Sequence, residues 1–458
     1  DRNEGRDTDL ENLTFQGGLA HTGGAIIMDG NISATFRNLV FRNNVGVVDG
    51  GAIFYNGGSG TANEEPLFVD CLFENNVSQS TQTNGWDGGA AFVTAGAPTF
   101  LRCTFRNNSG AQGGALAMGN CHRIDVIDCV FEDNDALFDG GGLRVESSQN
   151  VTVVGSTFTG NTGAAFGGGV YFENSTNVRF VGNDVVRNAT RDGGGLDALD
   201  SDVFIDRSRF FGNTATSRGG GLRFNRSDAT ITNSVVVGNF TGDDGGGVTV
   251  FGESTAFLEN CTVTANQAGD QIGGVFPDSM SRTTLLNTIV TGNTASVGTV
   301  IDWGGTGTVA AYTASYSIVD VSGLNGGTFG PNLLVAAPLD LFVRVPDAGA
   351  DAIWGTTDDD YGDLRLLPTA IAIDSGSSTD YTGPLADLDA NDRAQDDPNT
   401  PDTGLAFMEP TVDMGAFEFD IQTLGGNACS GDFDLDGDVD LGDFGVFGSD
   451  FGRSDCND

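Results

Sequence analysis

The residues best suited to chemistry lie near the end of the chain, in an alternating run of aspartates. A twelve-residue loop starting at Asp432 has acidic oxygens at positions 1, 3, 5, 9 and 12, with Gly437 at position 6 and Val439 at position 8. Ca²⁺ prefers six to eight oxygen ligands around one sharp turn, and a backbone carbonyl at position 7 can complete the set. The spacing therefore predicts a Ca²⁺ site; the alternative is an acidic, solvated tail. The aspartates of this segment are Asp432, Asp434, Asp436, Asp438, Asp440 and Asp443.

The seven cysteines fall into three groups. Cys429 and Cys456 flank the aspartate loop and are candidates for a disulfide that staples it. Cys121 stands alone. Because the chain has no Cys-x-x-Cys pair and only two histidines, a cysteine–histidine metal cluster is disfavoured. The remaining four recur at one position of a repeat described below, as free apolar thiols or as bridges between neighbouring repeats: Cys71, Cys103, Cys129 and Cys261.

A row of charged and aromatic side chains occupies one position in successive repeats, namely Arg144, Tyr171, Asp197 and Arg223. One interpretation is a solvated sheet face whose alternating charges fix strand register. The other is a surface that contacts a glycan. We predict no catalytic residue, because the row is extended rather than clustered and no Gly-His-Gly or Asn-Thr-Asp run occurs.

Composition narrows the function further. The chain has 458 residues, 63 acidic and 21 basic, and a formal charge of −42. Every basic residue is arginine, so lysine-based catalysis is excluded. Such a charge repels phosphate, which disfavours nucleic acids and anionic membranes as partners. No apolar run is long enough for a transmembrane helix.

The elements that position these residues come from a repeat of about 26 residues. Its clearest signature is Gly-Gly-(Gly/Ala) followed by two apolar residues that flank one other residue. A second signature, Phe or Val followed three residues later by Asn, precedes most copies. The Gly signature begins at Gly23, Gly50, Gly88, Gly113, Gly140, Gly167, Gly193, Gly219, Gly245 and Gly273.

Each repeat contains three short alternating segments separated by Gly, Asn and Asp, which predicts strands joined by turns. One repeat is too small to bury its own apolar face, so we expect the repeats to stack as a parallel β-solenoid. Small residues two positions before the Phe or Val would then form an interior column. The recurring Asn would form a second ladder, both because Asn tolerates left-handed backbone angles and because its amide can bind the next Asn.

This pattern resembles the right-handed parallel β-helix proteins of the pectate-lyase-like class over roughly residues 8 to 300. The resemblance implies an all-β fold, a right-handed parallel β-helix of about 10–11 coils. We therefore expect β-helix repeats over residues 1–300, an irregular β-rich end of the helix over 301–424, and a calcium-loop tail over 425–458.

The C-terminal third carries two further resemblances. The order of Asp351, Trp354, Asp374-Ser375-Gly376 and Met414-Gly415-Ala416 is similar to a module that ends many secreted bacterial β-helix proteins before a surface anchor. The aspartate loop looks like half of a dockerin and implies an EF-hand-like Ca²⁺ segment. Because the second dockerin loop is missing, binding of a cohesin-like partner is in doubt.

The chain begins inside a repeat, with Leu10 to Phe15 aligning with Leu258 to Val263. An uncovered solenoid end is an open sheet edge that can pair with another chain. Two expectations follow: upstream residues have been removed, or subunits self-associate through their solenoid ends.

These features lead to two hypotheses of function. The first is a secreted or cell-surface β-solenoid, non-enzymatic, structural or adhesive, stabilised by Ca²⁺ and able to form filaments end to end. The alternative is a lyase, hydrolase or glycan-binding module that acts on an acidic extracellular polysaccharide.

Overall fold

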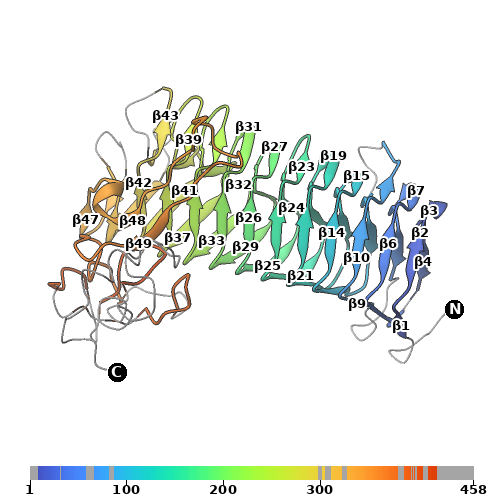
Figure 1. Cartoon of the computed structure of the whole chain (residues 1–458). Helices are drawn as coiled ribbons and strands as arrows, with labels where there is room; N and C mark the ends of the chain where they lie inside the picture. The colour runs from blue at the N-terminus through green and yellow to red at the C-terminus, as the bar shows by residue number, and fades with distance from the viewer. Residues whose placement is uncertain are drawn as a thin grey trace, which may run out of the picture.

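The computed structural model describes residues 9–30, 32–57, 66–81, 87–297, 302–304, 311–321, 327–379, 386–393, 395, 397, 400–405 and 411–419. Within these residues the chain forms an elongated parallel β-solenoid, with the N-terminal strands at one end and the C-terminal segments at the other (Figure 1). Among the described residues no helix is long and apolar enough to cross a membrane. The aspartate loop, Cys429 and Cys456 lie outside the described residues, so the Ca²⁺ site and the disulfide stay predictions.

Four parallel sheets, A to D, run along the solenoid. The first ten coils each contribute one strand to every sheet in that order, and the later coils contribute to sheets A and B and, in one case, to sheet C. Sheet A contains β1 (Asp9–Glu11), β5 (Thr35–Arg37), β9 (Leu67–Val69), β13 (Thr99–Leu101), β17 (Ile124–Ile127), β21 (Gln149–Val154), β25 (Thr176–Val181), β29 (Asp202–Asp206), β33 (Asp228–Thr232), β37 (Thr255–Glu259), β41 (Arg282–Leu286), β44 (Ala311–Ser315) and β46 (Thr328–Phe329).

Sheet B follows sheet A around each coil. It contains β2 (Thr14–Gln16), β6 (Val40–Arg42), β10 (Leu72–Glu74), β14 (Thr104–Arg106), β18 (Val130–Glu132), β22 (Thr157–Thr159), β26 (Asp184–Val186), β30 (Arg209–Phe211), β34 (Val235–Val237), β38 (Thr262–Thr264), β42 (Ile289–Thr291), β45 (Ser317–Ile318) and β47 (Leu333–Leu334).

Sheet C completes the turn from sheet B towards sheet D. It contains β3 (Leu19–Thr22), β7 (Val45–Asp49), β11 (Val77–Ser78), β15 (Ser109–Gln112), β19 (Asp135–Asp139), β23 (Thr162–Gly163), β27 (Ala189–Asp192), β31 (Thr214–Arg218), β35 (Phe240–Thr241), β39 (Gln267–Ala268) and β43 (Thr294–Ala295).

Sheet D closes each coil and carries the Gly-Gly signature at the start of its strands. It contains β4 (Ile26–Asp29), β8 (Ile53–Asn56), β12 (Ala91–Thr94), β16 (Leu116–Gly119), β20 (Leu143–Glu146), β24 (Val170–Glu173), β28 (Leu196–Leu199), β32 (Leu222–Asn225), β36 (Val248–Phe251) and β40 (Val275–Pro277).

The structure confirms a parallel solenoid of about eleven coils, as sheet C with its eleven strands shows. The expectation of three strands per coil was wrong, because sheet C supplies a fourth. Its strands are short and rich in Gly, Ser, Thr and Asp, as in Ser109–Gln112 and Thr162–Gly163, so they lack the apolar alternation that marks a strand in a sequence.

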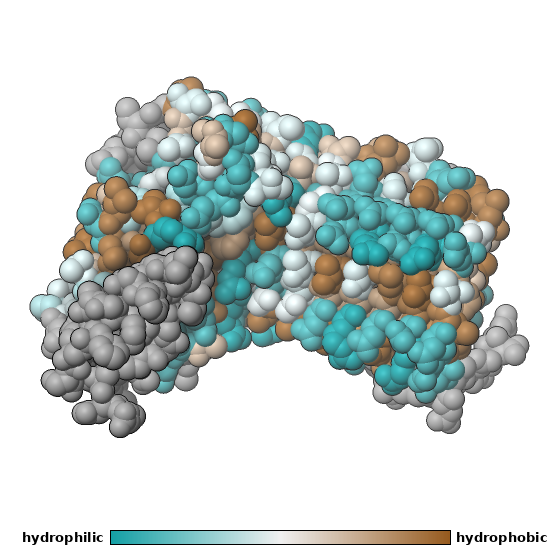
Figure 2. Space-filling view, in the orientation of Figure 1, coloured by the Kyte–Doolittle hydropathy of each residue, from teal (hydrophilic) through white to brown (hydrophobic). Residues whose placement is uncertain are grey.

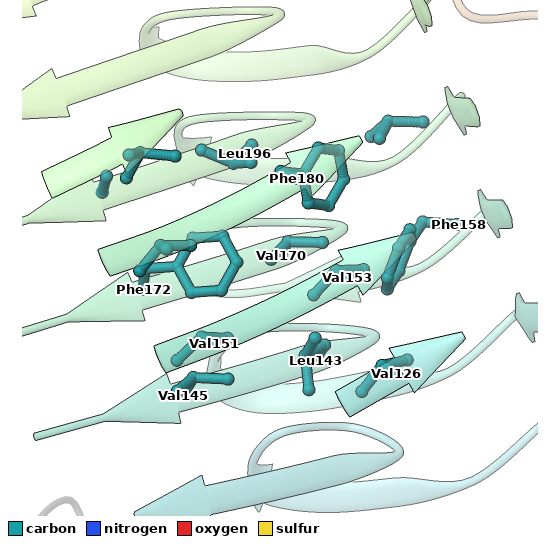
Figure 3. Packing of buried hydrophobic residues seen from close by; sticks show 14 of the residues in the cluster. Val126, Leu143, Val145, Val151, Val153, Phe158, Val170, Phe172, Phe180 and Leu196 are labelled. Atoms are coloured by element: carbon teal, nitrogen blue, oxygen red, sulfur yellow. The ribbon is translucent and has the colours of Figure 1, made fainter. Parts of the chain in front are cut away.

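The interior is filled by apolar side chains that stack from coil to coil. One column of phenylalanines places successive ring centroids 4.6 to 5.2 Å apart with nearly parallel planes. Figure 3 shows Val126 and Val153 of sheet A and Leu143 of sheet D pointing into the same interior. Full burial of one such side chain contributes about 1.5–3 kcal/mol. The column consists of Phe15, Phe41, Phe73, Phe105, Phe131 and Phe158.

The expected asparagine ladder is confirmed at the turn between sheets B and C. Each amide nitrogen donates to the amide oxygen of the Asn in the next coil at 2.9–3.0 Å, and that oxygen also accepts a backbone N–H. Asp302 accepts the last bond of the ladder. The members are Asn44, Asn76, Asn108, Asn134, Asn161, Asn188, Asn213, Asn239, Asn266 and Asn293.

The ladder asparagines were expected to adopt left-handed backbone angles themselves, and this expectation was wrong by one residue. The residue immediately before each ladder Asn has the positive φ, for example 52° at Asn43, 55° at Asn75 and 53° at Arg187. This preceding residue makes the sharp bend, so the ladder side chain can turn inward from ordinary backbone angles.

Small residues form two hydrogen-bonded columns at the other corners. In the expected column, the backbone N–H of Cys129 donates to Ser156, and that of Ser156 donates to Asn183. The second column begins at Cys121, whose backbone N–H donates to Ser148. This position accounts for Cys121, which stood apart from the other cysteines in the sequence. The five described cysteines are free, so no bridge joins neighbouring coils among them.

The Gly-Gly signature has a steric cause at the corner between sheets C and D. A Cβ atom built on Gly141 would lie 2.2 Å from the carbonyl oxygen of Gly168 in the next coil. Only glycine permits this close approach, which explains why the signature recurs in nearly every coil.

The described C-terminal residues pack back onto the outer face of sheet B. They include a short 3₁₀ helix, η1 (Pro338–Asp340), and an antiparallel pair, β48 (Phe342–Arg344) and β49 (Asp363–Leu366). Their apolar side chains share a second core with Val235, Val237 and Ile289 of the solenoid. We call residues 338–419 the C-terminal segment.

A buried polar network fastens the C-terminal segment to the solenoid. Arg393, fully buried, donates from Nε to Asn233 at 3.1 Å and from Nη1 to Glu418 at 3.3 Å. The amide of Asn287 exchanges two hydrogen bonds with the backbone of Ser377. Because these partners are buried, the segment and the solenoid are expected to hold one arrangement.

Candidate functional site

The predicted row lies on the outward positions of sheet D, one residue per coil. Arg144 is paired in register with Tyr171, Tyr171 with Asp197, and Asp197 with Arg223. The row therefore exists as the repeat alignment predicted. It is not solvated, however, because only 0–7% of each of these four residues is exposed.

Ion pairs and ring contacts hold the row together. Arg223 donates to Asp197 at 2.8 Å, and Arg144 donates to Glu173 of the next coil at 2.9 Å. Phe166 stacks on Tyr171 with ring centroids 5.7 Å apart, and the Arg223 guanidinium lies 5.5 Å from the centre of the Phe166 ring. The side chain of Phe166 thus lies against the row, in the turn between sheets C and D.

Burial changes the acid–base properties of the row. It raises the pKa of the Asp197 carboxyl despite the neighbouring Arg223, and it raises the pKa of Glu173 and of Tyr171. The Oδ1 atom of Asp197 and the Nε atom of Arg223 have no hydrogen-bond partner among the described residues. Such incomplete satisfaction of buried polar atoms costs free energy of folding, so the row is a buried, partly satisfied polar network.

This geometry fits the interpretation that the charges of the row fix strand register. It differs from that interpretation in one respect, because the side chains are buried and not solvated. No residue of the row lines the cavity on the outer face of sheet A or the cavity between sheet B and the C-terminal segment. Its role as a glycan face therefore stays a prediction, and burial leaves little of these side chains available for contact. Among the described residues, no group of three or more His, Cys, Asp or Glu side chains could hold a metal ion.

The cavity best placed to receive a ligand lies on the outer face of sheet A, where repeat alignment had singled out no residues. It has a volume of about 510 Å³ and spans strands β25 to β41. We call it the sheet A groove. Figure 2 shows that polar and apolar side chains form bands along the axis of the solenoid, as expected when equivalent residues stack.

The floor of the sheet A groove alternates aromatic and hydroxyl side chains. Phe204 is paired in register with Thr230, Thr230 with Phe257, and Phe257 with Thr284. Phe204 and Phe257 therefore lie two coils apart, and both are partly exposed. In the neighbouring coil the Arg179 guanidinium lies 5.0 Å from the centre of the Phe204 ring.

One edge of the sheet A groove is a line of exposed polar residues. Asp202 is paired in register with Asp228, Asp228 with Thr255, and Thr255 with Arg282. Thr255 donates a hydrogen bond to Asp228. This edge offers oxygen acceptors and one guanidinium beside a floor of aromatic and hydroxyl side chains, a combination suited to a ligand with many hydroxyl groups.

The sequence does contain a signal for the sheet A groove. Aligning the repeats on sheet A puts Arg179, Phe204, Thr230, Phe257 and Thr284 at one outward position. The Phe257 ring also packs against the edge of the second core, and the Phe204 ring lies beside Arg179. The recurrence of large, partly exposed aromatic side chains at outward positions in alternate coils indicates a contact surface.

Comparison with protein families decides the identity of the fold. The family model for the right-handed beta helix region matches residues 4–206 and 166–295, which together exceed half of the chain. The chain belongs to the right-handed β-helix family. The right-handed parallel β-helix expected from the repeat is therefore confirmed, and the β-helix accounts for the stacked sheets A to D.

Searches for relatives of the β-helix gave two further results. No curated protein sequence matched it. Among solved structures, the periplasmic alginate epimerase AlgG is 12% identical with a TM-score of 0.44, covering 69% of this chain and 78% of the epimerase. The pectate lyase Pel9A is 17% identical with a TM-score of 0.48, covering 85% of this chain and 89% of the lyase. At these values neither likeness bears on the substrate of the β-helix.

Proposed function

We propose that the β-helix binds an extended polysaccharide chain along the sheet A groove. The observation that carries the proposal is the pair of partly exposed phenylalanines, Phe204 and Phe257, two coils apart on a floor of hydroxyl side chains.

The spacing of the two rings suits a polysaccharide. Adjacent coils are about 4.8 Å apart, so rings two coils apart are separated by about 10 Å. One coil corresponds to roughly the length of one sugar residue. In an extended β-1,4-linked chain, successive sugars are turned over, so alternate sugars present the same face. Phe204 and Phe257 can each stack on the apolar face of one of these alternate sugars.

The charges of the sheet A groove favour a neutral chain. Asp202 and Asp228 can accept hydrogen bonds from sugar hydroxyls, and Arg282 can donate to them. A polyuronate carries a carboxylate on every sugar and would bring these charges close to both aspartates, in a protein with a formal charge of −42. The proposal therefore departs from the acidic polysaccharide expected from the sequence and takes an uncharged or sparsely charged chain instead.

The structural and adhesive role expected from the sequence has no support among the described residues, and self-association through the ends of the β-helix is not shown. We place the proposed binding outside the cell, where extended polysaccharides occur and where a densely acidic surface stays well solvated in salt. A Ca²⁺-binding tail would be compatible with this location.

Affinity measurements with a neutral β-1,4-linked hexasaccharide test the proposal. We expect binding by the unmodified protein and a loss of about five- to tenfold in affinity for Phe204→Ala or Phe257→Ala, since one aromatic contact contributes about 1 kcal/mol. Isothermal titration calorimetry gives the affinity, and circular dichroism checks the fold of each variant.

Phe251→Ala is the matched control, because Phe251 is a partly exposed aromatic residue on sheet D, away from the sheet A groove. It is expected to leave the affinity unchanged. Equal loss in all three variants, or tighter binding of polygalacturonate than of the neutral hexasaccharide, would overturn the proposal.

A further inference from the structure

The floor of the sheet A groove continues beyond Phe204 towards the N-terminal end of the β-helix. The outward residues aligned with it in successive coils are Arg179 of β25, Thr152 of β21, Asp125 of β17 and Thr99 of β13. Each of them is exposed or half-buried. The cavity itself reaches β25, so the aligned floor runs on for three more coils, about 14 Å.

The polar edge of the groove continues over the same coils. Asn177, which lines the groove, donates from its side-chain amide to the amide oxygen of Asn150 at 2.8 Å. Asn150 in turn donates to the backbone carbonyl of His122 at 3.0 Å. Both asparagines are exposed, and an amide group has two N–H donors and two acceptor lone pairs. Each can therefore form further hydrogen bonds with the hydroxyl groups of a ligand.

Arg179 joins this continuation to the groove. Its exposed guanidinium lies 5.0 Å from the centre of the Phe204 ring, and it forms no ion pair among the described residues. The N–H groups of a stacked guanidinium lie in its own plane and point away from the ring. Arg179 can therefore donate to a sugar next to the one that stacks on Phe204. We call Asn150 and the floor residues Thr99, Asp125, Thr152 and Arg179 the polar extension.

The charges of the polar extension suit the neutral chain proposed for the groove. Its one carboxylate, Asp125, is paired with Arg123 at 2.9 Å. The unpaired Arg179 offsets the single excess carboxylate among the residues that line the groove. A neutral polymer can therefore cross both parts of sheet A without meeting a surface of one sign of charge.

We infer that the polar extension binds about three further sugars of the same chain, at one sugar per coil, an inference that rests on the polysaccharide binding proposed for the groove. The ligand is then an interior segment of a long neutral polysaccharide, about eight sugars in length, and not a short oligosaccharide. The groove supplies the aromatic contacts, and the polar extension supplies hydrogen bonds only.

Titration calorimetry with neutral β-1,4-linked hexasaccharide and decasaccharide tests the polar extension. A decasaccharide can place six sugars in the groove in about five ways, so a gain in affinity of up to about fivefold needs no further contact. We expect the decasaccharide to bind more than tenfold more tightly than the hexasaccharide, because one hydrogen bond contributes severalfold in affinity.

Thr152→Phe tests the same surface by a gain of affinity. Thr152 lies two coils from Phe204, the separation of Phe204 from Phe257, so the new ring continues their spacing. We expect about fivefold tighter binding of the decasaccharide, as for one aromatic contact. Thr104→Phe is the matched control, because Thr104 is a half-buried outward threonine of sheet B. It should leave the affinity unchanged.

Asn150→Gly tests the edge without straining the backbone, because the φ of Asn150 is 52°, an angle that glycine adopts freely. It should reduce the gain of the decasaccharide over the hexasaccharide about threefold. Asn107→Gly replaces another exposed asparagine with a φ of 52°, at the corner between sheets B and C, and should keep the full gain.

The outcomes separate the polar extension from the groove. Hexasaccharide binding with a decasaccharide gain of fivefold or less overturns the polar extension alone, and so does a folded Thr152→Phe variant with unchanged affinity for the decasaccharide. Equal gains in Asn150→Gly and Asn107→Gly would also overturn it. If neither oligosaccharide binds, the groove fails as a polysaccharide site and the polar extension fails with it.

Discussion

At the scale of single residues, the fold depends on side chains that repeat the same contact in every coil. Each ladder asparagine uses both its amide nitrogen and its amide oxygen, and these bonds are buried. Removal of one member leaves buried donors and acceptors on both neighbouring coils without partners. The cost should exceed that of one ordinary hydrogen bond.

Asn134→Ala tests this ladder in the middle of the β-helix. The substitution leaves the amide nitrogen of Asn108 and the carbonyl oxygen of Phe105 without their partner. We expect a loss of about 3 kcal/mol in the free energy of unfolding, measured by denaturant titration. Gln149→Ala, which removes an exposed amide, is the control and should change stability little. Equal stability of the two variants would contradict the ladder's role.

At the scale of elements, repeat alignment predicted the strands of sheets A, B and D, because their apolar residues alternate. It failed for sheet C, whose strands are polar. It also placed the row of Arg144 and Asp197 in solvent, since alternation tells outward from inward but does not show that Phe166 lies against an outward face. The cavity between sheet B and the C-terminal segment could not be predicted, because it joins residues more than 130 positions apart, such as Arg209 and Arg344.

The docking of the C-terminal segment should depend on pH. Burial raises the pKa of Asp413 to about 7, and it raises the pKa of Glu418 as well. Between the unfolded pKa of about 4 and the folded one, the docked form holds protons that the undocked form has released. Stability from docking is therefore fully present below about pH 4 and is lost as the pH rises through about 7.

Thermal unfolding between pH 4.5 and 8 checks this dependence. We expect the transition of the unmodified protein to fall as pH rises, and Asp413→Asn to flatten the profile, because asparagine keeps an oxygen acceptor but does not ionise. The effect is at most about 4 kcal/mol. Asp351→Asn changes an exposed carboxylate of the same segment and should keep the original profile. Stability that rises with pH would contradict the assignment.

At the scale of the whole molecule, stability is the sum of similar coils and the contacts between neighbours. Stacked ladders make each coil interchangeable with the next, so a coil can be removed if the corners remain aligned. Deletion of residues 113–139 joins Gln112 to Gly140, which occupies the place of Gly113, and lets Asn108 meet Asn161.

This deletion variant should fold into a β-helix that is shorter by one coil, about 4.8 Å, in small-angle scattering. Its circular dichroism should match that of the full chain, with only a modest drop in melting temperature. An unfolded product, or loss of the β-sheet signal, would show that the coils are not interchangeable. As a control, deletion of residues 113–126 breaks the register and should prevent folding.

The proposal for the groove also belongs to this scale, because only stacked coils bring Phe204 and Phe257 onto one line. A crystal structure of the protein with a neutral β-1,4-linked hexasaccharide tests it most directly. We predict that the sugar chain runs parallel to the axis of the β-helix over sheet A, with alternate sugars stacked on Phe204 and Phe257. A sugar chain bound elsewhere, or lying across the axis without touching either ring, would contradict the account.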